Sequence, residues 1–146
     1  MYAVEVRERI MVAHSLPDPF FGPAQGMHGA TFVVDVAFLR ETLTSQNVVV
    51  DIGAALEVLK ATLKPLAYQN LDALPQFKGK LTTTEFLCRY VFDAMAKAAG
   101  EGALGEDART LAKIRVTLSE TDLARAWFEG PVEGPVEGPG EGPVPG

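Results

Sequence analysis

The sequence predicts an α+β domain, because strand-like and helical patterns of apolar residues occur in separate segments of the chain. Three segments place apolar residues at every second position, which is typical of half-buried β-strands. Two others place them three or four residues apart, which is typical of helices packed on one side. The strand-like segments are 2–14, 28–38 and 112–121, and the helical segments are 52–63 and 82–100.

Length and composition fit one domain of ordinary size. The chain has 146 residues, enough to bury a core without disulfide support. Its single cysteine excludes an intrachain disulfide, and the cytoplasm is therefore the expected compartment. The net charge is −6 and the 13 basic residues are scattered, which argues against a nucleic-acid partner. We expect no membrane span and no signal peptide, because charged residues interrupt the apolar runs.

The first two strands each carry a histidine at one end of the apolar face. In residues 2–14 the apolar side chains fall on even positions, and His14 follows them on that face. In residues 28–38 the same parity runs from Phe38 back to His28. Such a histidine can be satisfied by a backbone carbonyl, or it can be a metal ligand or an acid–base group.

The middle of the chain predicts two helices and their connections. We expect a loop over 15–23, a short extended piece over 48–50, and Asp51 as the cap of the first helix. Residues 66–80 read mostly as loop. Thr82 with Glu85 fits a capping box for the second helix, within which Cys88 is expected to be a small core residue.

The last predicted strand, 112–121, ends with Glu120 on its apolar side. If the three strands belong to one sheet, His14, His28 and Glu120 could converge on one pocket. Two imidazoles and a carboxylate are side chains that commonly form a metal or acid–base site. After this strand we expect a short segment over 122–128 that could form a helical turn. The domain is then expected to span residues 1–128. Residues 129–146 repeat Glu-Gly-Pro-Val, and we expect them to be a disordered tail.

The order of these elements resembles the 6-pyruvoyl-tetrahydropterin synthase and 6-carboxy-tetrahydropterin synthase family over roughly residues 4–128. The motifs that carry the resemblance are Val12-Ala13-His14, His28-Gly29-Ala30, Val48-Val49-Val50-Asp51, Thr83-Thr84-Glu85 and Leu118-Ser119-Glu120-Thr121. The resemblance implies a tunnelling fold (T-fold), in which two helices cover one face of an antiparallel four-stranded sheet. It also implies a homo-oligomer, a trimer or hexamer, with active sites between subunits.

For the site, the resemblance implies that His14 and His28 are zinc ligands and that Glu120, with Thr84, binds the pterin ring. A carboxylate suits this task because it can accept two parallel N–H bonds from an aminopyrimidine edge. The implied activity is that of a lyase acting on a pterin such as dihydroneopterin triphosphate.

The sequence departs from the family pattern at three places. Ala30 stands in place of the third zinc histidine, and Ala24 in place of the catalytic cysteine. Ala67-Tyr68 aligns with the catalytic Asp-His pair. The ligand set for zinc is thus incomplete, since two imidazoles alone should hold the metal weakly.

Three functions follow from these observations. The protein could convert a pterin with substitute groups, with Tyr68 as an acid–base residue and Glu120 or Asp35 as carboxylates, although Asp35 has the wrong parity for the pocket face. It could be a catalytically degenerate pterin-binding protein. It could also be a structural subunit that works with an active paralogue.

Overall fold

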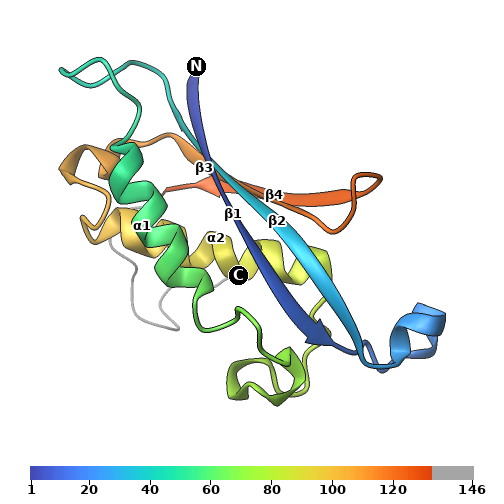
Figure 1. The fold of residues 1–146 in the computed structure, drawn as a ribbon. Helices are drawn as coiled ribbons and strands as arrows, with labels where there is room; N and C mark the ends of the chain where they lie inside the picture. The colour runs from blue at the N-terminus through green and yellow to red at the C-terminus, as the bar shows by residue number, and fades with distance from the viewer. Residues whose placement is uncertain (133–146) are drawn as a thin grey trace, which may run out of the picture.

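The computed structural model describes residues 1–132, and in it a single antiparallel sheet is covered on one face by two α-helices (Figure 1). The strands are β1 (Tyr2–His14), β2 (His28–Arg40), β3 (Lys113–Ser119) and β4 (Arg125–Pro131). The α-helices are α1 (Ile52–Leu63) and α2 (Thr84–Gly100). Short 3-10 helices occupy the connections: η1 (Pro19–Gln25), η2 (Leu71–Ala73), η3 (Pro75–Phe77) and η4 (Glu106–Thr110).

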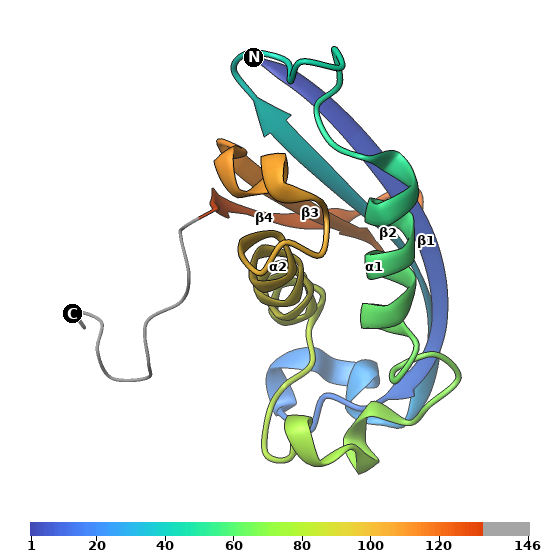
Figure 2. The ribbon, with the colours of Figure 1, turned by 90° about the vertical axis from the view of Figure 1, so that its left-hand side faces the viewer.

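The four strands are arranged in the order β1-β2-β3-β4, and every neighbouring pair is antiparallel. In register, Val6 lies beside Val36, which lies beside Val116. These side chains belong to the even-numbered face, on which α1 and α2 lie (Figure 2). The predicted α+β class, the four-stranded antiparallel sheet and the two helices on one face are therefore confirmed.

The core lies between this face and the helices. Its large, fully buried members include Phe32, Phe38, Leu59, Leu63, Leu87, Met95, Ile114 and Leu118. They come from β2, β3, α1 and α2, so the apolar side chains of all four elements pack into the same core. Burial of these side chains supplies most of the free energy that favours folding.

The fourth strand corrects two predictions. Residues 122–128 do not form a helical turn, because Arg125–Phe128 are paired with β3. Glu129, Gly130 and Pro131 continue β4, so the domain runs past residue 128 into the predicted tail. The Glu129 carboxylate accepts hydrogen bonds from Lys113 and Arg115, which favours pairing over disorder. The rest of the tail, from residue 133, lies outside the described residues.

The helix caps agree with the sequence in one case and differ in the other. Asp51 caps α1, because its carboxylate accepts a hydrogen bond from the Ala54 N–H at 3.1 Å. For α2 the predicted capping box of Thr82 and Glu85 is wrong. Thr83 is the cap, and its Oγ1 accepts from the Phe86 N–H at 3.1 Å. The Thr82 hydroxyl is buried and has a different partner, described below.

The connections differ from the predictions in both directions. Residues 48–50 form no strand, although Val49 and Val50 are buried. Residues 66–80 contain η2 and η3. The loop predicted over 15–23 contains the beginning of η1, which ends two residues after it. The chain at 68–70 runs along the outer edge of β1. There the Tyr68 N–H donates to the Met11 carbonyl and the Ala13 N–H donates to the Gln69 carbonyl.

No helix among residues 1–132 is long and apolar enough to cross a lipid bilayer.

Candidate functional site

Two histidines meet where β1 ends and β2 begins. His14 and His28 are cross-strand partners in the sheet, and both occupy the face that the helices cover. Their ring centroids are 4.6 Å apart and the ring planes cross at 61°. Both side chains lie on one face, as the parity of the two strands predicts, and strand pairing brings them into direct contact.

His14 is the more buried of the two, with 2% of its surface exposed. Its Nδ1 is hydrogen-bonded to the Thr82 Oγ1 at 3.0 Å, whereas its Nε2 is buried without a hydrogen-bond partner in the described structure. Burial lowers the pKa of His14, and the neighbouring His28 lowers it further. The carboxylates of Asp72 and Glu120 act in the opposite direction. The imidazole is thus held in its neutral form near neutral pH.

His28 is half-buried and has a local backbone partner. Its Nδ1 lies 2.9 Å from the Gly26 carbonyl oxygen. Since a carbonyl only accepts, Nδ1 carries the proton in this contact and Nε2 presents a lone pair. One of the two ring nitrogens of His28 is therefore hydrogen-bonded to a backbone carbonyl, which is the structural alternative to a ligand or acid–base role.

Glu120 lies with Thr84 in a small hollow at the same end of the sheet. The Thr84 hydroxyl donates to the Glu120 carboxylate over 3.4 Å, a long hydrogen bond. The hollow has a volume of about 230 Å³ and is lined by Thr84, Glu85, Glu120 and residues 124–126. Thr82, just before α2, contacts His14, and Thr84, the first residue of α2, contacts Glu120, so the two contacts are only two residues apart in the chain.

A second hollow, of about 440 Å³, lies beyond the end of β1. Its lining includes Ser15, Asp72 and Lys80. The Ser15 hydroxyl donates to the Asp72 carboxylate at 2.5 Å, and the Ser15 N–H donates to the same group. Sequence reasoning missed Asp72. It comes from a segment read as loop, and only the pairing of residue 70 with β1 brings it to His14.

The other predicted side chains lie elsewhere. Asp35 is on the opposite face of the sheet, as its parity indicated, where it accepts two hydrogen bonds from Arg7. Tyr68 is 81% exposed and has a positive φ of 61°. Cys88 is buried in the core, where loss of solvation raises the pKa of its thiol to about 11. Neither Asp35 nor Cys88 is part of the histidine site.

The histidine pair does not extend to a full set of metal ligands. Among the described residues there is no group of three or more His, Cys, Asp or Glu side chains that could hold a metal ion. Ala30, on the same face as His28, contributes a methyl group that packs against the core. The donor set present therefore does not fit a site with three protein ligands for zinc.

The chain matches one protein-family model, and its fold is similar to those of solved structures. The family model described as 6-pyruvoyl tetrahydropterin synthase matches residues 3–131. A Caenorhabditis elegans 6-pyruvoyl tetrahydropterin synthase has a similar structure, with 21% identity and a TM-score of 0.73 over 88% of this chain and 95% of that one. For the Plasmodium vivax 6-pyruvoyl tetrahydropterin synthase the identity is 15% and the TM-score 0.70, over 90% and 99%. A search of curated proteins gives no match.

Proposed function

The chain belongs to the 6-pyruvoyl tetrahydropterin synthase family, and from this premise we propose that it binds a pterin beside Glu120 and acts on the pterin side chain. The candidate substrate is dihydroneopterin triphosphate. One observation carries the proposal: the short segment 82–84, where α2 begins, contacts both the His14 and His28 pair and the hollow beside Glu120. Thr82 bonds His14, and Thr84 bonds Glu120.

In this proposal Glu120 anchors the ring. Its carboxylate is exposed apart from the long contact with Thr84, so it can accept a pair of N–H donors from an aminopyrimidine edge. Thr84 keeps the carboxylate oriented, and its hydroxyl can also bond the ligand. The two groups define which edge of a planar heterocycle enters first.

The histidines are the proposed acid–base groups. Within residues 1–132, His14 offers a buried Nε2 that has no hydrogen-bond partner. Its lowered pKa keeps this imidazole neutral near neutral pH, as a general base requires. His28 shares the face and offers a second lone pair. Tyr68 is the third proposed acid–base residue. Its exposed side chain would serve a site in a neighbouring copy.

The described residues do not form a complete zinc site. His14 and His28 could contribute two nitrogen ligands, but Ala30 supplies no third ligand and the remaining coordination would have to come from outside the described chain. Metal content by mass spectrometry on untagged protein tests this directly, since a tight site should retain about one zinc per chain.

A second copy is expected to complete the site. At about 230 Å³ the hollow beside Glu120 is smaller than the roughly 300–1,000 Å³ of typical ligand pockets. We therefore propose a homo-oligomer, a trimer or hexamer, in which a neighbour closes the open side. Light scattering coupled to size-exclusion chromatography measures this mass.

Calorimetric titration with neopterin tests the ring site. We expect binding by the unaltered protein and loss of most of the affinity in Glu120→Gln, because the neutral amide accepts fewer N–H bonds. Glu57→Gln is the control, since it removes a carboxylate from the exposed side of α1. Equal affinity in all three proteins would rule out the role of Glu120.

Chromatography after incubation with dihydroneopterin triphosphate, with and without zinc, tests conversion. A product that disappears in His14→Asn supports the acid–base role of this residue. Pterin binding without conversion supports the second candidate function, a pterin-binding protein, which Ala24 and Ala30 favour because both lack the reactive groups of the family pattern. A chain that purifies only with a second protein supports a partner subunit.

A further inference from the structure

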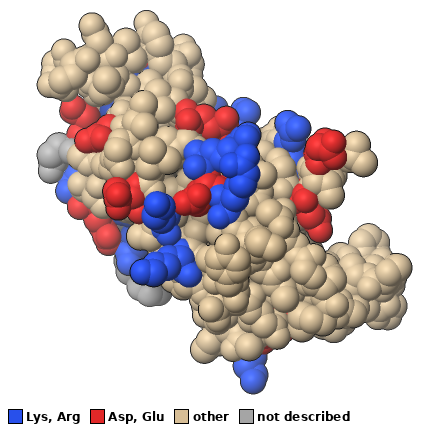
Figure 3. Space-filling view, viewed as in Figure 1, with Lys and Arg blue, Asp and Glu red and all other residues tan. Residues whose placement is uncertain are grey.

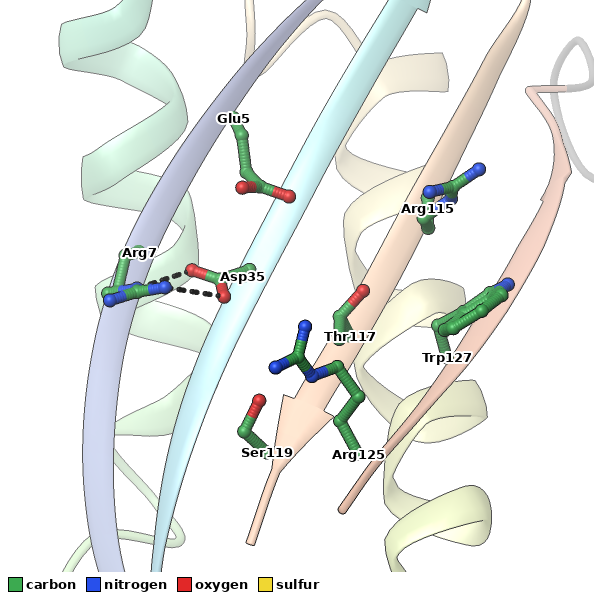
Figure 4. A pocket seen from close by; sticks show the side chains of 8 residues that line it. All are labelled: Glu5, Arg7, Asp35, Arg115, Thr117, Ser119, Arg125 and Trp127. Carbon is green, nitrogen blue, oxygen red and sulfur yellow. Dashed lines mark hydrogen bonds and ion pairs between the residues drawn. The ribbon is translucent and has the colours of Figure 1, made fainter. Parts of the chain in front are cut away.

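The face of the sheet turned away from the helices carries a charged groove that the pterin proposal does not use. Figure 3 looks onto this face, and its middle is covered by basic and acidic side chains. A groove of about 270 Å³ runs here across all four strands, lined by Glu5, Arg7, Asp35, Arg115, Thr117, Ser119, Arg125 and Trp127 (Figure 4). All eight residues have odd numbers, and odd positions point away from the core in each strand.

Two of the three arginines in the groove are neutralised by carboxylates. Arg7 makes two hydrogen bonds to Asp35, at 2.6 and 3.0 Å. Arg115 donates to Glu129 at 2.8 Å and lies over the Trp127 ring, with 5.4 Å between its guanidinium carbon and the ring centroid. Because each of these two arginines is paired with a carboxylate, they leave little net charge to attract an anionic ligand.

Arg125 differs from both. It is exposed, and within residues 1–132 its guanidinium has no ion pair or hydrogen bond. Figure 4 shows it leaning from β4 over β3 toward Ser119. Ser119 is its cross-strand partner, and Thr117 is one position further on the same face. Glu5, the other carboxylate that lines the groove besides Asp35, has no ion pair within residues 1–132 and lies at the far end of the groove.

The hydroxyl groups beside Arg125 are also uncommitted. Neither the Thr117 nor the Ser119 hydroxyl takes part in a side-chain hydrogen bond within the described part of the chain. One guanidinium with five N–H donors and two hydroxyl donors thus border the same end of one groove. Planar N–H forks and hydroxyls are the groups that bind tetrahedral oxyanions.

We propose that the Arg125 end of this groove binds a phosphate-type oxyanion, with Ser119 and Thr117 as additional donors. The groove lies on the side of the sheet opposite to Glu120 by parity. Arg125 lines both the groove and the hollow beside Glu120, whereas Thr117 and Ser119 line only the groove. The anion is either free phosphate or the terminal group of a phosphate monoester, since both present the same oxygens. The proposal does not depend on pterin binding.

Trp127 provides the signal for a test. It is the one tryptophan in the chain, it is 59% exposed, and it lines the groove. We would titrate the full chain with inorganic phosphate and, separately, with glycerol 3-phosphate. Tryptophan fluorescence and calorimetry would be followed at constant ionic strength set with chloride.

Saturable binding is expected, and Arg125→Gln should weaken it by at least about tenfold, because a charge-assisted pair of hydrogen bonds is lost. Ser119→Ala should weaken it less. Lys60→Gln is the matched control, since it removes one positive charge from α1 on the other side of the sheet. Binding of phosphate alone identifies a free anion, and binding of both probes identifies a terminal phosphoryl group.

The proposal is overturned if neither probe binds, or if Arg125→Gln and Lys60→Gln bind as tightly as the unaltered protein. Thr84→Ala alters the hollow beside Glu120 without changing a charge or a residue of the groove, so it should leave the phosphate titration unchanged. Failure of the pterin titration and failure of the phosphate titration are therefore separate results, and each rejects only its own site.

Discussion

His14 and His28 face one another across the β1 and β2 ladder, and their rings are in edge-to-face contact with 4.6 Å between centroids. Protonation of His14 would place a charge in a buried position next to a second imidazole. The contact therefore favours a neutral pair, and this preference has a measurable consequence for stability.

The free energy of unfolding should fall as the pH is lowered below about 6.5, the ordinary pKa of histidine. In this range the unfolded chain takes up a proton at residue 14 that the folded chain does not, because the folded pKa is lowered. Stability therefore rises with pH through this window. In His14→Asn the slope should be smaller, as measured by urea denaturation at several pH values. An unchanged slope would contradict the burial argument.

The Thr82 hydroxyl should stabilise the fold through His14. Thr82→Val keeps the shape of the side chain but leaves the buried Nδ1 without a partner, at a cost of about 1–3 kcal/mol in the free energy of unfolding. Thr83→Ala is the comparison, since it removes the cap of α2 at a cost of about 1 kcal/mol. Only Thr82→Val should also shift the NMR titration of His14.

Cys88 should be inert toward thiol reagents in the folded protein. Its side chain is buried, and a pKa of about 11 leaves almost no thiolate near neutral pH. With a chromogenic disulfide, reaction should be slow in buffer and fast in denaturant. Fast labelling under native conditions would show that α2 opens locally or that the thiol is accessible.

Gly130 should not accept a larger side chain. A Cβ at this position would lie 2.9 Å from the Phe92 ring, so Gly130→Ala is expected to destabilise the fold by about 1–3 kcal/mol through overpacking. Gly26→Ala is the control, because its Cβ would meet nothing closer than 3.9 Å. Thermal denaturation compares the two, and equal midpoints would argue against a packed β4.

Much of the fold could be predicted because the apolar periodicity is regular where the core is formed. β1, β2 and α1 were predicted within two residues at each end, as each has several large residues on one face. The parity of His14, His28 and Asp35 follows from the same pattern, and strand register then determines which faces they share.

β4 could not be predicted, because residues typical of turns interrupt its alternation of apolar and polar side chains. Gly130 and Pro131 read as breakers, yet one is required by the Phe92 ring and the other lies at the end of the strand. Thr82 was assigned to a capping box from spacing alone, whereas its partner is 68 residues away in sequence. Asp72 and the Arg125 groove likewise depend on contacts that local patterns do not contain.

The chain at 68–70 limits how β1 can be extended. The Met11 carbonyl and the Ala13 N–H, which point outward from the sheet, are already occupied by Tyr68 and Gln69. A strand from another molecule could align with this edge only before Met11, and it would have to turn aside there. The length of any intermolecular ladder on this side is therefore set within the monomer, before two copies meet.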